Sequence, residues 1–175
     1  GMDMVKSSTP QTVRDAMKKT ANMVLNGSEE ELHKFVSGFR EQFNNLPPEM
    51  IAFPRGVNKL EETYCRADGP FRNDVTVVII SRAAINFNNA IKSYGLDYPL
   101  IVNGDKIKYV HLTEPNKFQT HVFGFTDTLP KELDIHKKVD YDQMLFKTYL
   151  KPMGDLVDLI GWSFEPKASI DAFFM

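Results

Sequence analysis

Helical spacing of the hydrophobic residues dominates both ends of this chain, and strand-like composition is confined to its middle. The stretch SEEELHKFVSGFREQF opens with a capping box formed by Ser28 and Glu31. Its apolar residues recur at intervals of three and four and therefore share one face of a helix: Leu32, Phe35, Val36, Phe39 and Phe43. Such a face has to be buried, so the pattern constrains this part of the chain to a packed helix.

Two further helices are expected on either side of the middle region. In SSTPQTVRDAMKKTANMVLNG, Thr9 is the expected N-cap, Pro10 the first helical residue and Gly27 the stop. Residues 139–162 predict one long helix or a kinked pair, with a bend or restart at Pro152. The expected buried positions of that segment repeat at helical spacing: Leu145, Tyr149, Met153, Leu156 and Ile160.

The middle of the chain carries the strand signals. MIAF is a short strand candidate closed by Pro54, and HVFGF is another. Asn103-Gly104 within PLIVNGDKIKYVHL predicts a hairpin turn. VTVVII has strand composition, but helical spacing takes over after it, and a helix is expected from Ser81 onward. The sequence thus predicts an α+β fold, with a small antiparallel sheet inserted between N- and C-terminal helices and an extended C-terminal tail.

Composition limits the possible functions. Hydrophobic residues make up 42% and the net charge is −2, which is ordinary for one globular domain and gives no strong field toward nucleic acid. No apolar run is long enough to cross a membrane, no signal peptide is expected, and one cysteine, Cys65, fits a reducing cytoplasm. We find no phosphate-binding glycine loop, no metal-ligand spacing among the histidines and no catalytic set.

The last residues, KASIDAFFM, are unusually apolar for a terminus. Ile170, Phe173 and Phe174 stand at i, i+3 and i+4, so one helical turn would place them on one face. Ser169 suits the N-cap and Asp171 the first turn of such a helix. The tail either packs onto its own domain or is held out for the groove of a partner.

Several stretches in this order resemble one known protein region. They are VKSSTPQTVRDAM, IAFPRGVNKL, NGDKIKYVHL, TLPKELDIHKKVDYDQMLFKTYLKPMGDLVDLIGW and KASIDAFFM. Together they resemble the C-terminal thumb region of the replicative family B DNA polymerase of T-even-type bacteriophages. The resemblance implies a thumb domain over residues 3–164 and a clamp-binding tail over residues 165–175.

A thumb, as the resemblance implies, grips the primer–template duplex through sugar and phosphate contacts that do not read the sequence. The parent enzyme is a nucleotidyltransferase, and its Mg²⁺-binding carboxylates lie in the palm. This chain would then hold no cofactor, would be inactive alone, and would work with the palm, fingers and exonuclease in the cytoplasm of the infected bacterium, with no membrane partner.

Six residues are DNA-contact candidates under this resemblance. Arg82 matches the arginine of the family's thumb-helix motif, whereas Ile80 replaces a histidine that the family usually has. Lys106 and Lys108 would share one strand face, although two solvated lysines are the alternative. Ser7, Ser8 and Thr9 form a hydroxyl cluster at a helix start, where plain capping is the alternative.

The resemblance also assigns the tail. In the family the extreme C-terminus binds the ring-shaped sliding clamp, and the matching residues here are Ser169, Ile170, Asp171, Phe173 and Phe174. A rival hypothesis is a free-standing adaptor that binds a partner through the same apolar tail and never contacts DNA.

Overall fold

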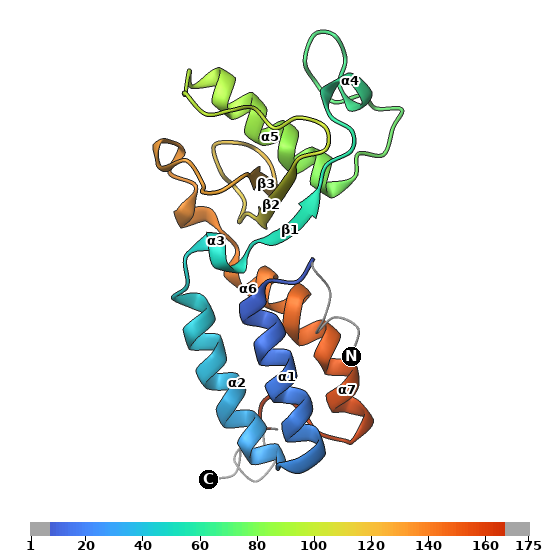
Figure 1. Cartoon of the computed structure of the whole chain (residues 1–175), viewed down its shortest axis with the longest axis vertical. Helices are drawn as coiled ribbons and strands as arrows, with labels where there is room; N and C mark the ends of the chain where they lie inside the picture. The colour runs from blue at the N-terminus through green and yellow to red at the C-terminus, as the bar shows by residue number, and fades with distance from the viewer. Residues whose placement is uncertain (1–7, 167–175) are drawn as a thin grey trace, which may run out of the picture. The chain divides into compact units, whose positions relative to one another are not determined.

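The computed structural model describes residues 8–166, and these form two compact units (Figure 1). Unit 1 combines the described residues up to Leu46 with those from Leu145 onward, and unit 2 runs from Pro47 to Met144. Unit 1 is helical, and unit 2 holds a three-stranded sheet with helices. The predicted α+β class is therefore confirmed. No helix in the described part is long and apolar enough to cross a membrane.

Unit 1 contains α1 (Gln11–Asn26), α2 (Glu29–Asn44) and a C-terminal helical segment. The capping box is confirmed, because the Ser28 hydroxyl oxygen accepts a hydrogen bond from the Glu31 N–H at 3.2 Å. Gly27 ends α1 as predicted. The predicted Thr9 cap is wrong: Pro10, with extended ψ of 146°, is the N-cap itself, and no side chain caps this helix end. The helix consequently begins one residue later than predicted.

The C-terminal segment of unit 1 is divided, and a new helical element starts beside Pro152 as predicted. The π-helical stretch η4 (Phe146–Leu150) is followed by α7 (Lys151–Leu159), which has Pro152 in its first turn. The short helix α6 (Tyr141–Leu145) precedes them and lies almost entirely in unit 2. Three of the five expected positions, Leu145, Tyr149 and Met153, are buried. Val157 is buried in place of the expected Leu156, which is half-buried. Ile160 follows the last residue of α7 and is 42% exposed.

A buried hydroxyl pair links α1 to this segment inside unit 1. The Thr20 and Tyr149 hydroxyl oxygens lie 2.5 Å apart, and Thr20 also donates to the Ala16 carbonyl. Tyr149 packs against Phe39 of α2 at a ring-centroid distance of 5.1 Å. Burial raises the pKa of Tyr149 to about 12, while the hydrogen bond with Thr20 opposes this rise.

We expect this pKa to make unit 1 sensitive to alkali. The ordinary pKa is 10.0, so between about pH 10 and 12 the folded state keeps a proton that the unfolded state has lost. The free energy of unfolding should therefore fall across that window by about 2–3 kcal/mol. Denaturant titrations at pH 9 and pH 12 measure this loss. Tyr149→Phe should remove most of it, and Tyr94→Phe, at a side chain 49% exposed, should leave it in place. An equal loss in wild type and Tyr149→Phe would contradict the assignment.

Unit 2 is built on an antiparallel sheet of order β1-β2-β3. Its strands are β1 (Phe53–Gly56), β2 (Lys106–His111) and β3 (Val122–Phe125), and α5 (Ile79–Ser93) packs on β3. Gly124 allows this approach, because a Cβ there would lie 3.0 Å from the Ala83 backbone. The short helices are α3 (Pro48–Ile51), α4 (Glu61–Tyr64), η2 (Lys131–Leu133) and η3 (His136–Lys138).

Two strand predictions in unit 2 need correction. The MIAF strand is wrong, because α3 extends to Ile51 and β1 begins at Phe53 and continues through Pro54. Proline is tolerated there since β1 is an edge strand. The helix expected from Ser81 begins at Ile79, whereas the predicted strand HVFGF is confirmed as β3.

The hairpin predicted around Asn103-Gly104 does not form either, although a turn is present there. Gly104 has a φ of +92°, but residues 99–102 pair with no strand in the described structure. The buried Asn88 side chain forms hydrogen bonds with the backbone of this segment instead. It accepts a hydrogen bond from the Ile101 N–H at 2.8 Å and donates one to the Ile101 carbonyl at 3.0 Å. A strand partner would have needed these same groups.

Candidate nucleic-acid interface

A cleft of about 320 Å³ in unit 2 lies between the end of β1 and the start of α5. Its wall contains two basic side chains, Arg55 and Lys59, and no acidic one. Both basic residues are exposed. The remaining lining residues are Gly56, Asn58, Tyr64, Val78, Ile80 and Ser81. The cleft is therefore a locally positive surface on a chain whose overall charge is −2.

The first turn of α5 adds to this positive character. Val78 is the N-cap and contributes no side-chain hydrogen bond to the helix end. The first backbone N–H groups of a helix have no intrahelical partner, and the helix dipole places partial positive charge on them. An anion in the cleft would meet both the side-chain cations and this helix end.

Arg55 is positioned by the sheet. It lies on β1 opposite Ile107, and Tyr109 is the partner of Phe53 two positions away. Burial raises the pKa of Tyr109, and the positive charge of Arg55 opposes that rise. The sheet thus fixes the backbone from which the Arg55 side chain reaches solvent.

Arg82 lies one helical turn beyond Val78 on α5. Its guanidinium carbon is 4.4 Å from the centroid of the Phe71 ring, which holds the side chain against the loop before α5. Burial and the charge of Glu61 raise the pKa of Cys65, and Arg82 lowers it. Arg82 is half-buried and is therefore a positioned cation close to the cleft.

The two lysines of β2 stand on alternate positions of the strand and have different surroundings. The Lys108 ammonium donates to the Glu49 carbonyl at 3.1 Å and is half-buried. Lys106 is exposed and lines a separate cavity that also contains Asp105 and Asp127. These carboxylates reduce the local positive potential, so the surroundings favour an anion less here than in the cleft.

The other predicted site residues lie elsewhere. Ser8 is exposed and Thr9 is buried, and both belong to unit 1. Ser7 and the tail residues Ser169, Ile170, Asp171, Phe173 and Phe174 lie outside the described residues. No group of His, Cys, Asp and Glu side chains within residues 8–166 is arranged to hold a metal ion.

Comparison with known proteins identifies relatives along the whole chain. No family model matches it. The DNA-directed DNA polymerase of Enterobacteria phage T4 is 25% identical over 178 residues, which covers 99% of this chain and 19% of that polymerase. The chain matches a fragment of the T-even-type phage polymerase. The DNA-directed DNA polymerase of Escherichia phage RB69 is 28% identical over 180 residues, again 99% of this chain and 19% of the relative. The chain thus spans about a fifth of the length of these phage polymerases.

Sequence reasoning did not select Arg55, Lys59 or Ser81 as site residues. A signal for two of them was present, because IAFPRGVNKL carries two basic residues within a stretch that resembles the phage polymerase. Arg55 and Ser81 line the same cleft although they are more than twenty residues apart in sequence. Only the fold of unit 2 brings the end of β1 next to the start of α5.

Proposed function

We propose that the chain is the thumb region of a family B replicative polymerase of a phage, and that it grips the primer–template duplex by its sugar-phosphate backbone. The observation that carries this proposal is the match to two phage DNA polymerases over 99% of the chain. Palm, fingers and exonuclease would be supplied by the rest of the enzyme, as would the carboxylates for Mg²⁺. The site of action would be the cytoplasm of the infected bacterium.

The cleft beside α5 supports a phosphate-contacting role. Arg55 and Lys59 supply two exposed cations, Arg82 adds one held against Phe71, and the start of α5 supplies backbone N–H groups. Such contacts position a duplex without reading its bases. Ile80 lies in the cleft wall with an apolar side chain, so it offers no hydrogen bond where the family usually has histidine.

The tail is proposed to bind the sliding clamp through Ile170, Phe173 and Phe174, with Ser169 as the cap and Asp171 in the first helical turn. Its apolar spacing fits a short helix in a groove. Two weak attachments, one to DNA and one to the clamp, would reinforce each other because linked sites raise effective concentration.

We expect the full chain to bind a primed duplex weakly, with no sequence preference. A few neutralised phosphates give a slope of log affinity against log salt on the order of −2 to −4. Arg55→Ala with Lys59→Ala should lower affinity about tenfold at low salt and make the slope shallower by about 2 units. Fluorescence anisotropy with a labelled duplex measures both quantities.

The matched control is Lys131→Ala with Lys137→Ala, which removes the same charge from exposed positions away from the cleft. It should change affinity far less than the cleft variant does. Lys106→Ala with Lys108→Ala tests the β2 surface in the same assay. If the control and the cleft variant bind equally, the cleft is not the contact, and if the wild-type chain shows no salt-dependent binding, the thumb assignment fails.

A further inference from the structure

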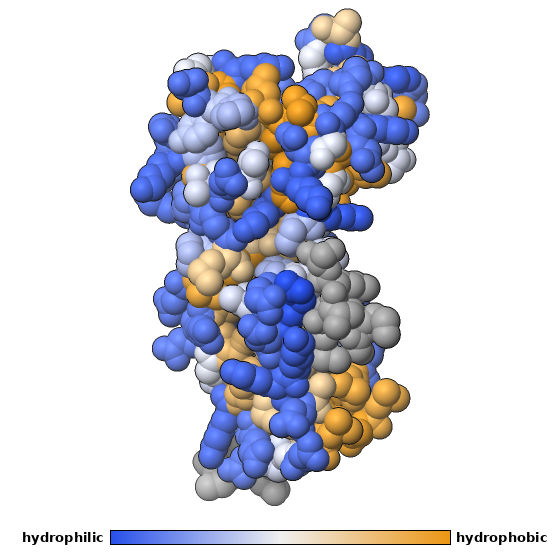
Figure 2. All heavy atoms as spheres, in the orientation of Figure 1, coloured by the Kyte–Doolittle hydropathy of each residue, from blue (hydrophilic) through white to orange (hydrophobic). Residues whose placement is uncertain are grey.

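One end of unit 1 carries apolar side chains that its own core leaves uncovered. Leu159, near the end of α7, is 82% exposed, and Leu25, near the end of α1, is 79% exposed. Ile160 follows directly and is 42% exposed. Both helices finish at the same end of unit 1 (Figure 1), and Figure 2 shows an apolar area over the end of α7. A contiguous apolar surface of this kind marks an interaction site more often than a single exposed residue does.

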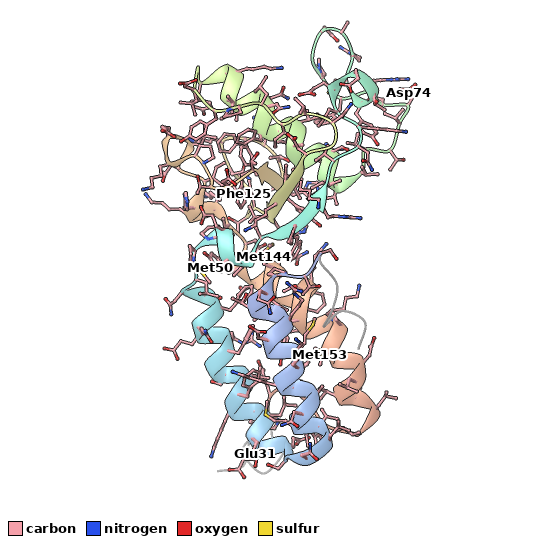
Figure 3. The ribbon with its side chains drawn as sticks, in the orientation of Figure 1. Glu31, Met50, Asp74, Phe125, Met144 and Met153 are labelled. Carbon is pink, nitrogen blue, oxygen red and sulfur yellow. The ribbon has the colours of Figure 1, made fainter. Side chains whose placement is uncertain are left out.

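The same end is acidic. Asp155 and Asp158 are exposed on the last turns of α7. Glu29, Glu30 and Glu31 form the first turn of α2, and Figure 3 labels Glu31 at this end of the unit. The last turns of α1 and α7 contain no basic residue. We call the surface formed by Leu25, Leu159, Ile160, these glutamates and these aspartates the bundle tip.

This charge decides which class of partner fits the bundle tip. Nucleic acid is disfavoured as the occupant, because phosphates would meet five carboxylates and the negative ends of α1 and α7, which together outweigh the positive end of α2. The nearest lysine on α2, Lys34, is already 3.9 Å from Glu30. A protein surface with an apolar centre and basic residues at its rim complements both features.

The point where the tail leaves unit 1 indicates which protein would bind the bundle tip. After α7 the chain is fixed along α2, because Ser163 O lies 2.8 Å from the His33 ring nitrogen and Glu165 forms an ion pair with Arg40 at 3.0 Å. Arg40 lies about 17 Å along α2 from Glu29. Ile170 follows Glu165 by only five residues, which span at most about 17 Å. Ile170 can therefore lie no more than about 34 Å from the bundle tip, a distance that one globular domain can span.

We propose that the bundle tip is a second docking surface for the protein that binds the tail, so that the clamp contacts this chain at two places. This inference rests on the proposed function for the identity of the partner. The tail alone would then account for only part of the affinity, since two linked contacts bind more tightly than either one.

The test compares the full chain with the free peptide of residues 167–175, using the cognate sliding clamp in calorimetry. The full chain should bind about tenfold more tightly than the peptide. Leu159→Ser with Ile160→Ser should bring the full chain to within about threefold of the peptide. Both positions are exposed, so the fold should tolerate the change. Asp155→Lys with Asp158→Lys should weaken binding in the same way if the partner's rim is basic.

The matched control is Leu100→Ser with Val102→Ser in unit 2, at side chains that are 39% and 56% exposed. It should bind as the wild type does. Equal affinity of peptide and full chain, or an equal loss in the control, would overturn the inference. A third outcome is that the peptide does not bind, whereas the full chain binds and loses affinity in Leu159→Ser with Ile160→Ser. This outcome would support the bundle tip as a docking surface and would overturn the proposed role of the tail.

Discussion

Replacement of Asn88 by alanine should destabilise unit 2 by about 3–4 kcal/mol. The Asn88 side chain is 2% exposed, and its amide binds both the N–H and the carbonyl of Ile101, which is itself buried. It also donates to the Glu61 carboxylate at 3.0 Å. Alanine would leave two buried backbone groups without a partner, and each such group costs about 1–3 kcal/mol. Urea denaturation of the full chain, followed by a probe in unit 2, measures the change.

The neighbouring residue supplies the control. Asn89 is exposed on the same helix, so Asn89→Ala should change the free energy of unfolding by less than about 0.5 kcal/mol. Helix propensity improves equally in both variants, which leaves the hydrogen bonds to Ile101 as the difference. Similar stabilities for the two variants would show that residues 99–102 are held by something other than Asn88.

The helices of unit 1 could be predicted from sequence because their signals are local. The capping box of Ser28 and Glu31, the stop at Gly27 and the helix start beside Pro152 each act within a few residues of their position. The burial of Val157 in place of Leu156 could not be predicted, because both residues follow Met153 at helical spacing. Local spacing alone does not decide between two such neighbours.

The strands of unit 2 were less predictable because they depend on partners distant in sequence. Asn103-Gly104 is a strong hairpin signal, yet the strand after it pairs with β1 and β3. The competing contact comes from Asn88, whose hydrogen bonds to Ile101 are not indicated by any local sequence pattern. The candidate cleft was unpredictable for the same reason, because it also depends on residues distant in sequence. Arg55 and Lys59 are near each other in sequence, but Ser81 lies beside them only because of how α5 packs.

Removal of the tail should have the largest effect on binding to the clamp. Burial of each apolar side chain among Ile170, Phe173 and Phe174 contributes about 1.5–3 kcal/mol. Ordering the backbone costs about 1–2 kcal/mol for each fixed residue. These two terms largely offset each other, so the tail should bind weakly, with a dissociation constant in the micromolar range or above. A chain that ends at Pro166 loses all three apolar side chains and should bind the cognate clamp at least about a hundredfold more weakly.

Point variants separate the contributions within the tail. Phe173→Ala and Phe174→Ala should each weaken binding by about 2–3 kcal/mol, because each removes a ring that the groove would bury. Ser169→Ala should cost only about 1 kcal/mol, the usual value for a lost N-cap. Calorimetry of the full chain and of each variant gives the order directly. If the chain ending at Pro166 binds as tightly as the full chain, the clamp attaches elsewhere, and if Ser169→Ala costs more than Phe173→Ala, the tail does not bind as an apolar helical turn.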